Sequence, residues 1–170
     1  NRIQQSGKYI MQFKRKLKRY LFAFIMLVLS AYTTIFIKNY VDSMDPEKTL
    51  PGISVSIGYT QPAVVRAGYT WKFGPGIEPK LSPYVSSVDA GLMVTDCFPG
   101  EIIVVNFTHT PELVTLYEAQ GLANEEFRQM YALTTPSEEG VYVYKIDAQF
   151  EQGDILYYFA VEVKKDNIMQ

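Results

Sequence analysis

One uncharged apolar run near the N-terminus restricts this chain more than any other feature. Residues 21–37 read LFAFIMLVLSAYTTIFI, seventeen positions interrupted only by one serine, one tyrosine and two threonines. A helix of this length extends roughly 25 Å, close to the ~30 Å hydrocarbon core of a bilayer, and flanking residues lengthen it. We therefore predict a single transmembrane helix over residues 21–38.

The charged residues divide the chain at this run. Residues 1–20 hold seven Lys and Arg and no Asp or Glu, whereas past Lys38 eight Lys and Arg face all eighteen Asp and Glu, a formal charge of −10. Lys and Arg beside a membrane span set which end stays in the cytoplasm. We expect a basic cytoplasmic segment over 1–20, which contacts lipid headgroups and not nucleic acid, and an extracytoplasmic part after Lys38 at the cell membrane.

Two other interpretations of the run stay open. A cleavable signal peptide would share the basic start, and residues 29–31 (LSA) would serve as its small-residue cleavage site. Against cleavage, the apolar run continues through residues 35–37. A buried helix of a soluble fold is the second alternative, although the run is long for such a helix and its basic flank lies on one side only.

The part after the run changes to a period of two. Residues 39–50 are polar and without apolar periodicity, so we predict a linker there. Residues 53–57 alternate apolar and small polar side chains, which predicts a half-buried strand. Residues 101–107 (EIIVVNF) are apolar on both faces at their centre and predict an interior strand, and residues 113–117 predict another short strand.

Two segments are ambiguous, and one is the clearest unit of the chain. Residues 123–133 are compatible with a helix or a strand, and residues 84–94 with an interrupted strand. By contrast, residues 142–150 and 155–163 alternate on both sides of the turn at 151–154 (EQGD), which predicts a β-hairpin. We predict an all-β fold, an antiparallel sandwich over residues 51–165 with a tail at 166–170.

Residues 139–144 (EGVYVY) resemble the entry to the penultimate strand of immunoglobulin-like (Ig-like) sandwiches. There an acidic residue and a glycine precede a tyrosine whose hydroxyl caps the corner. The resemblance implies that Tyr142 is the corner tyrosine and that Tyr144 stands where antibody domains have their second Cys. Trp71 precedes the 101–107 strand, whereas in antibody domains the tryptophan follows the first Cys, so we do not expect an antibody-type domain.

A second resemblance concerns residues 69–71 (YTW) together with 140–144 (GVYVY). In this order they are similar to small membrane-anchored or lipid-anchored extracytoplasmic proteins of Gram-positive bacteria, in which an Ig-like module follows one basic-flanked apolar segment. Members of that group often carry a Cys where this chain has Thr70. The resemblance, over roughly residues 51–165, implies an Ig-like fold and an extracytoplasmic place, and no residue-level chemistry.

Cys97 and His109 are the only thiol and imidazole of the chain. The strand predicted between them would hold its ends roughly 20 Å apart, whereas a Cys/His dyad needs hydrogen-bond contact. We therefore expect no such dyad, and no metal site, because the ligands for one are missing. Cys97 is expected to be half-buried in a turn, with an intermolecular disulfide as the alternative outside the membrane.

Two further residue sets were weighed as sites. Acidic pairs occur at 125–126, at 138–139 and at Asp89 with Asp96, and we expect them to be solvated, although a glycosidase would need two carboxylates across a cleft. Three alternating aromatic side chains share one face of a strand, either as core or as an interaction face for sugars or a peptide; they are Tyr69, Trp71 and Phe73.

We expect no catalytic centre and no cofactor, by subtraction of the chemistries above. The leading hypothesis is a single-pass envelope protein, anchored in the lipid bilayer, whose acidic sandwich binds or supports a membrane-proximal envelope protein or wall component. One alternative is a cell-wall hydrolase or sensor with a shallow aromatic and acidic cleft. The other is an accessory subunit that packs through its membrane helix.

Overall fold

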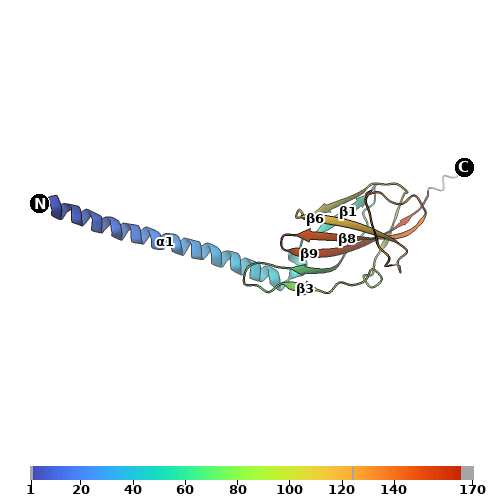
Figure 1. The fold of residues 1–170 in the computed structure, drawn as a ribbon. Coiled ribbons are helices and arrows are strands. Elements are labelled where there is room, and N and C mark those ends of the chain that lie inside the picture. The colour runs from blue at the N-terminus through green and yellow to red at the C-terminus, as the bar shows by residue number, and fades with distance from the viewer. Residues whose placement is uncertain (1, 124, 166–170) are drawn as a thin grey trace.

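The computed structural model describes residues 2–123 and 125–165, with side chains described from residue 15 onward. The predicted tail at 166–170 lies outside the described residues. Helix α1 (Arg2–Met44) is followed by the short helix α2 (Pro46–Thr49) and then by strands. Figure 1 shows α1 projecting from one end of the β domain.

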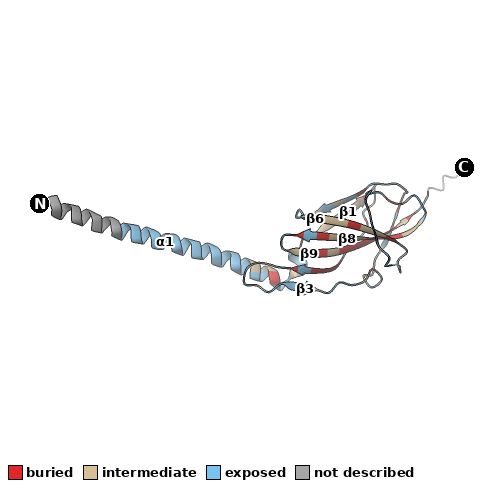
Figure 2. Ribbon diagram, viewed as in Figure 1, coloured by how far each residue is buried: buried red, intermediate tan, exposed pale blue. Residues whose placement is uncertain are grey.

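Helix α1 is long and apolar enough to cross a membrane. The segment Arg15–Met44 has 30 residues, and none of its most apolar stretch is buried within the chain. Figure 2 shows the described part of α1 exposed along nearly its whole length. The hydroxyls of Thr33 and Thr34 donate to the carbonyls of Leu29 and Ser30, so these polar groups are satisfied inside the helix.

The predicted linker at 39–50 is mostly helical. Helix α1 continues through Met44, and α2 begins with Pro46 at its first position, where a proline costs no hydrogen bond. The residue before a proline avoids the helical conformation, and Asp45 accordingly has an extended φ of −133°, which separates the two helices. Residues 39–50 lack the apolar periodicity that predicts a helix, because among them only Ser43 and Leu50 have buried side chains.

In the described residues, nine strands form two sheets that are mostly antiparallel. The strands are β1 (Ile53–Ile57), β2 (Val65–Trp71), β3 (Lys80–Ser82), β4 (Val94–Cys97), β5 (Ile103–Phe107), β6 (Leu113–Gln120), β7 (Arg128–Gln129), β8 (Gly140–Phe150) and β9 (Gly153–Val163). One sheet is β1–β5, and the other has the order β3-β2-β9-β8-β6-β7. One edge of β9 has two partners. Its first half pairs antiparallel with β2, and its second half pairs parallel with β4. The predicted combination of an apolar N-terminal helix and antiparallel sheets is confirmed.

The β8–β9 hairpin is present, with a tighter turn than predicted. Phe150 pairs directly with Gly153, so only residues 151–152 form the turn, where four residues were expected. Gly153 has a φ of +150°, and a Cβ there would collide with the carbonyl oxygen of Thr70. Glycine therefore lets β2 approach the end of the hairpin.

The core lies between the two sheets. Its largest fully buried side chains include Tyr144, Tyr157 and Phe159, and the rings of Tyr144 and Phe159 stack with centroids 4.7 Å apart. A second, smaller cluster around Val143 and Tyr158 lies on the other face of the large sheet, under loop side chains such as Phe127. The centre of the hairpin is thus buried on both faces, which Figure 2 shows in red.

Three predicted elements differ from the structure. Residues 101–107 do not form an interior strand, because β5 pairs only with β1 and with a loop, and leaves Ile102 and Val104 exposed. Residues 123–133 form neither helix nor long strand; their described part is irregular around β7. Residues 84–94 are loop and turn until β4 begins at Val94.

Polar contacts attach the helical segment to the domain. Arg66 on β2 donates to the Glu47 carboxylate at 2.7 Å and to the carbonyl of Pro51 at 3.3 Å. The buried hydroxyl of Tyr157 on β9 donates to the same carbonyl at 2.8 Å. Together with the buried Leu50 side chain, these contacts hold residues 47–51 against the large sheet.

Candidate functional site

The largest cavity that we find in the described part of the chain lies at the end of the domain opposite α1. We call it the distal groove; it has a volume of about 730 Å³. Its lining comprises Gly100, Glu118, Ala119, Gln120, Glu126, Arg128, Gln129, Met130, Tyr131, Ala132, Thr134, Thr135, Pro136, Ser137, Glu138 and Tyr142. The eleven residues of β9 extend roughly 35 Å, which separates this groove from the helix junction at the other end of the hairpin.

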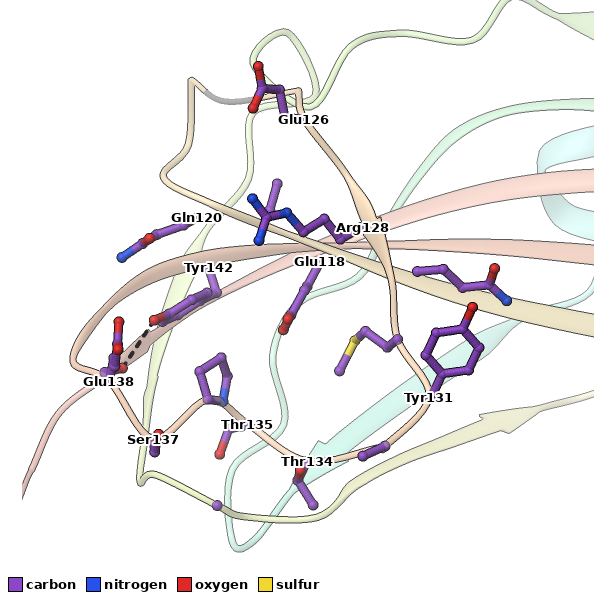
Figure 3. Close-up of a pocket in the computed structure, with 16 residues that line it drawn as sticks. Glu118, Gln120, Glu126, Arg128, Tyr131, Thr134, Thr135, Ser137, Glu138 and Tyr142 are labelled. Atoms are coloured by element: carbon purple, nitrogen blue, oxygen red, sulfur yellow. Dashed lines mark hydrogen bonds between the residues drawn. The ribbon is translucent and has the colours of Figure 1, made fainter.

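The groove is built where one chain segment crosses between the two sheets. Met130 N–H donates to the carbonyl of Leu116 on β6 at 2.9 Å, and Ile103 N–H donates to the carbonyl of Leu133 at 2.9 Å. Residues 130–135 therefore begin beside the large sheet and end beside β5. The hollow lies between this crossing segment and the ends of β6 and β8, as Figure 3 shows.

Thr135 fixes the far end of the crossing segment. Its buried hydroxyl donates to the carbonyl of Phe98 at 2.7 Å and accepts from the backbone N–H of Glu101 at 2.9 Å. The Thr135 N–H also donates to the carbonyl of Glu101 at 2.8 Å. One side chain and its backbone thus join the groove wall to the turn that precedes β5.

Carboxylates outnumber cations in the lining. The lining includes the carboxylates of Glu118, Glu126 and Glu138 and one guanidinium, that of Arg128. Arg128 lies opposite Glu118 in the β6–β7 register. Burial raises the pKa of Tyr142, and the charges of Glu138 and Glu118 raise that pKa further. A negative potential at the groove disfavours the phenolate and favours a cationic ligand.

An exposed aromatic ring completes the lining. Tyr131 is 92% exposed, although tyrosine is a residue that proteins usually bury at least in part. In Figure 3 its ring stands on the crossing segment, at the opposite side of the groove from Tyr142. Exposed tyrosines combine a flat apolar surface with a hydroxyl, a combination that is enriched at binding interfaces.

Tyr142 lies in the groove, and its hydroxyl is hydrogen-bonded to the backbone. Its hydroxyl donates to the backbone carbonyl of Glu138, four residues upstream, at 3.2 Å. This bond is the dashed line in Figure 3. Glu138 belonged to a predicted acidic pair, whereas Glu118, Arg128 and Tyr131 were not anticipated as a site, because the strand pairing that gathers them is not readable from residues 123–133.

Of the two roles weighed for the alternating aromatic side chains, the structure supports the core. Tyr69 and Trp71 on β2 are 6% and 8% exposed, and Phe73 packs against the same core as a half-buried side chain. The ring of Trp71 meets that of Phe150 edge-on at 5.4 Å. Tyr69 and Trp71 therefore offer no exposed stacking surface, because the core between the two sheets uses their rings.

Cys97 and His109 line separate cavities at opposite ends of the domain. Cys97, at the end of β4, lines a cavity of about 400 Å³, and His109 lines one of about 190 Å³ beside the helix junction. Burial raises the pKa of the Cys97 thiol to about 11, with Glu101 and Asp96 adding to the shift. A disulfide to another chain would first require this buried thiol to become exposed. Within residues 2–123 and 125–165 no cluster of His, Cys, Asp and Glu could hold a metal ion.

Comparisons with known proteins supply no relative for this chain. No protein-family model matches it, and neither the curated proteins nor the solved structures give a match. Arguments about its function therefore start from the geometry of the distal groove and from helix α1.

Proposed function

We infer that this chain is a single-pass membrane protein that uses its distal groove to bind a basic segment of another envelope component. In this proposal α1 crosses the cell membrane with its N-terminus in the cytoplasm, and the β domain lies outside. The seven cations of residues 1–20 support the orientation, because Lys and Arg remain on the cytoplasmic side of a span. The domain acts by contact and not by catalysis.

The observation that carries the proposal is the distal groove itself. Its volume of about 730 Å³ lies within the range of ligand-binding pockets, and its lining combines three carboxylates with an exposed tyrosine. A partner with Lys or Arg side chains would gain charge-assisted hydrogen bonds to Glu118 and Glu138. The formal charge of −10 past Lys38 would attract such a partner over a longer range.

The β domain is, in this proposal, a variant of the Ig-like sandwich of small anchored proteins of Gram-positive bacteria. The Tyr142 hydroxyl bond to the Glu138 carbonyl supports it, as does the long hairpin that follows. Two features would distinguish this variant from an antibody domain: Trp71 lies on β2, and β4 pairs in parallel with β9.

Site-specific crosslinking tests the contact hypothesis. A photoreactive amino acid at Tyr131, in the groove, should yield adducts with membrane-proximal proteins in intact cells. The same group at Met93, just before β4, is the matched control, because that side chain is also well exposed but lies outside the groove. Glu118→Gln with Glu138→Gln, and raised ionic strength, should each reduce the Tyr131 adducts.

Two results would overturn the proposal. Equal adducts from Tyr131 and Met93, or adducts that are unchanged by both the glutamate substitutions and salt, would exclude recognition by the groove. Cleavage of peptidoglycan by the purified protein, abolished by a single carboxylate-to-amide change in the groove, would establish the hydrolase alternative. Protease added to intact protoplasts tests the orientation separately, since it should degrade the β domain and spare residues 1–20.

A further inference from the structure

The loop that joins β2 to β3 turns back along helix α1. A Cβ placed on Gly74 would lie 2.5 Å from Nδ2 of Asn39, and one placed on Gly76 would lie 3.7 Å from Cε2 of Phe36. Gly76 has a φ of +77°, which a glycine adopts without strain. Figure 1 shows this loop, in green, beside the last turns of α1.

The nearness of Gly76 to Phe36 shows how far the loop reaches along α1. Phe36 belongs to the uncharged run 21–37, and eight residues separate it from Met44 at the end of α1. At 1.5 Å per residue the loop therefore extends about 12 Å back along the helix from its end. If the hydrocarbon region ends near Lys38, the loop lies at the level of the lipid headgroups.

The composition of the loop is suited to the level of the lipid headgroups. Residues 72–79 (KFGPGIEP) carry the half-buried side chain of Ile77, two prolines and the exposed Lys72, and Lys80 follows directly, while the half-buried Phe73 packs against the core of the domain. Only Glu78 is acidic, so residues 72–80 have a formal charge of +1 in a domain that is otherwise strongly acidic. Apolar side chains flanked by lysines favour the boundary between headgroups and acyl chains.

The loop keeps its place because the junction beneath it is braced. Arg66 binds Glu47 and Pro51, Tyr157 binds the carbonyl of Pro51, and Leu50 is buried in the core. These contacts join the end of the helical segment to β2 and β9, the strands that carry the loop and the hairpin turn. The loop and the helix therefore approach the bilayer as one unit.

We propose that residues 72–79 form a lipid-contact surface that lies in the headgroup layer of the membrane that α1 crosses. This surface rests on the membrane span of the proposed function and not on the distal groove. It turns the domain so that the β2–β3 end faces the bilayer, and the groove, roughly 35 Å away along β9, faces outward. The partner is the lipid bilayer, with anionic headgroups favoured by Lys72 and Lys80.

The test uses the full chain in vesicles of phosphatidylcholine and phosphatidylglycerol. Cys97→Ser removes the single cysteine, and an environment-sensitive fluorophore is then attached at Ile77→Cys, at Phe24→Cys within α1, or at Tyr131→Cys in the distal groove. Nitroxide-labelled lipid headgroups should quench the Ile77 fluorophore strongly and shift its emission to the blue. The fluorophore at position 131 should be neither quenched nor shifted.

Each alternative outcome has its own meaning. A fluorophore at position 77 that behaves like the one at 131, while acyl-chain nitroxides quench the one at 24, overturns the lipid-contact surface and leaves the membrane span intact. A fluorophore at 24 that no lipid nitroxide quenches overturns the span, and the lipid-contact surface with it. Neither result bears on the groove, which the crosslinking experiment tests.

A second variant separates lipid contact from mere proximity. With the fluorophore at Pro75→Cys, the added change Ile77→Asp should reduce headgroup quenching several-fold, because a carboxylate disfavours the boundary layer. Ile102→Asp, an exposed side chain of the outward part of the domain, is the matched control and should leave quenching unchanged. Equal quenching in the two variants would contradict the proposal.

Discussion

Residues 21–37 of helix α1 and the β8–β9 hairpin are both rich in apolar side chains, and they differ in burial. Phe22 in α1 is 66% exposed, whereas Phe159 in β9 is fully buried. The hairpin alternates its side chains between two clusters that the rest of the chain covers. Residues 21–37 of helix α1 are apolar all round, and no part of the chain covers the most apolar stretch of the helix.

The difference shows that apolar content alone does not predict where a segment is buried. A period of two directs side chains to the core of the same chain, since a sheet needs a partner for each face. An uncharged helix without a polar face needs a surrounding that the chain does not supply, and a bilayer is such a surrounding. The same substitution should therefore change the stability of the β domain in one region and not in the other.

The largest expected effect comes from the same change made in both regions. Phe159→Ala should lower the free energy of unfolding of the β domain by about 3–5 kcal/mol, because it leaves a cavity beside Tyr144. Phe22→Ala should leave that free energy unchanged. Denaturant unfolding of the full chain in detergent, followed by the fluorescence of the single Trp71, measures both. A large effect of Phe22→Ala would show that α1 packs on the domain.

A charge inserted into each region is the converse experiment. Leu27→Arg lies at the middle of the span and should cost about 2.5–3.5 kcal/mol of membrane insertion. Leu113→Arg on β6 starts from a similarly exposed side chain, 53% against 68%, but one that faces water, and should not alter insertion. Resistance to alkaline extraction from membranes measures the outcome. Full retention of the Leu27→Arg protein would contradict a membrane-spanning α1.

Two tyrosines of β8 should respond in opposite directions to loss of a hydroxyl. The Tyr142 hydroxyl donates to Glu138, so Tyr142→Phe should destabilise the domain by about 1 kcal/mol. The buried Tyr144 hydroxyl has no hydrogen-bond partner among the described residues, and burial raises the pKa of Tyr144 far above its usual range. Tyr144→Phe should therefore stabilise the domain by about 1 kcal/mol. Denaturation midpoints that move in the same direction would refute the pairing assigned to one of the two.

The sequence predicts well those features that depend only on one short segment of the chain. The apolar run and the β8–β9 alternation each lie within a few turns or one hairpin, so local period suffices to predict them. Residues 123–133 fail this test because their conformation depends on two distant partners, Leu116 and Ile103. The tight turn at 151–152 also depends on a distant residue, since Thr70 requires the glycine at 153.

The distal groove could not be predicted from the sequence, because residues that are distant in the chain form it. Glu118 and Arg128 meet only through the β6–β7 pairing, and Thr135 reaches Phe98 across 37 positions of the chain. Tyr142 could be anticipated, because its neighbours 139–144 carry a recognisable local pattern. Conversely, alternation placed Tyr69 and Trp71 on one face without indicating that this face meets the second sheet.

The smallest expected effect concerns one charged side chain of the β8–β9 hairpin, that of Asp147. Burial raises the pKa of Asp147, the Asp154 carboxylate on the neighbouring strand raises it further, and Lys145 lowers it in part. The folded domain thus holds the Asp147 proton more tightly than the unfolded chain does. Stability from this group is fully present at low pH and is lost as pH rises through the pKa of the folded state. Asp147→Asn should stabilise the domain by about 0.5 kcal/mol at pH 7, within the range of a single cross-strand pair.

This gain should shrink as pH falls toward roughly 4, the ordinary range of an aspartate, because the carboxyl of the unmodified chain then becomes neutral as well. Asp96→Asn is the control, since that exposed carboxylate binds Lys164 at 2.9 Å and its removal should be neutral or slightly destabilising at pH 7. Paired denaturation curves of the two variants at pH 7 and pH 4 measure the difference. If the Asp147→Asn gain persists undiminished at pH 4, charge is not its cause, and the hairpin tolerates the half-buried Asp147 carboxylate for a packing reason instead.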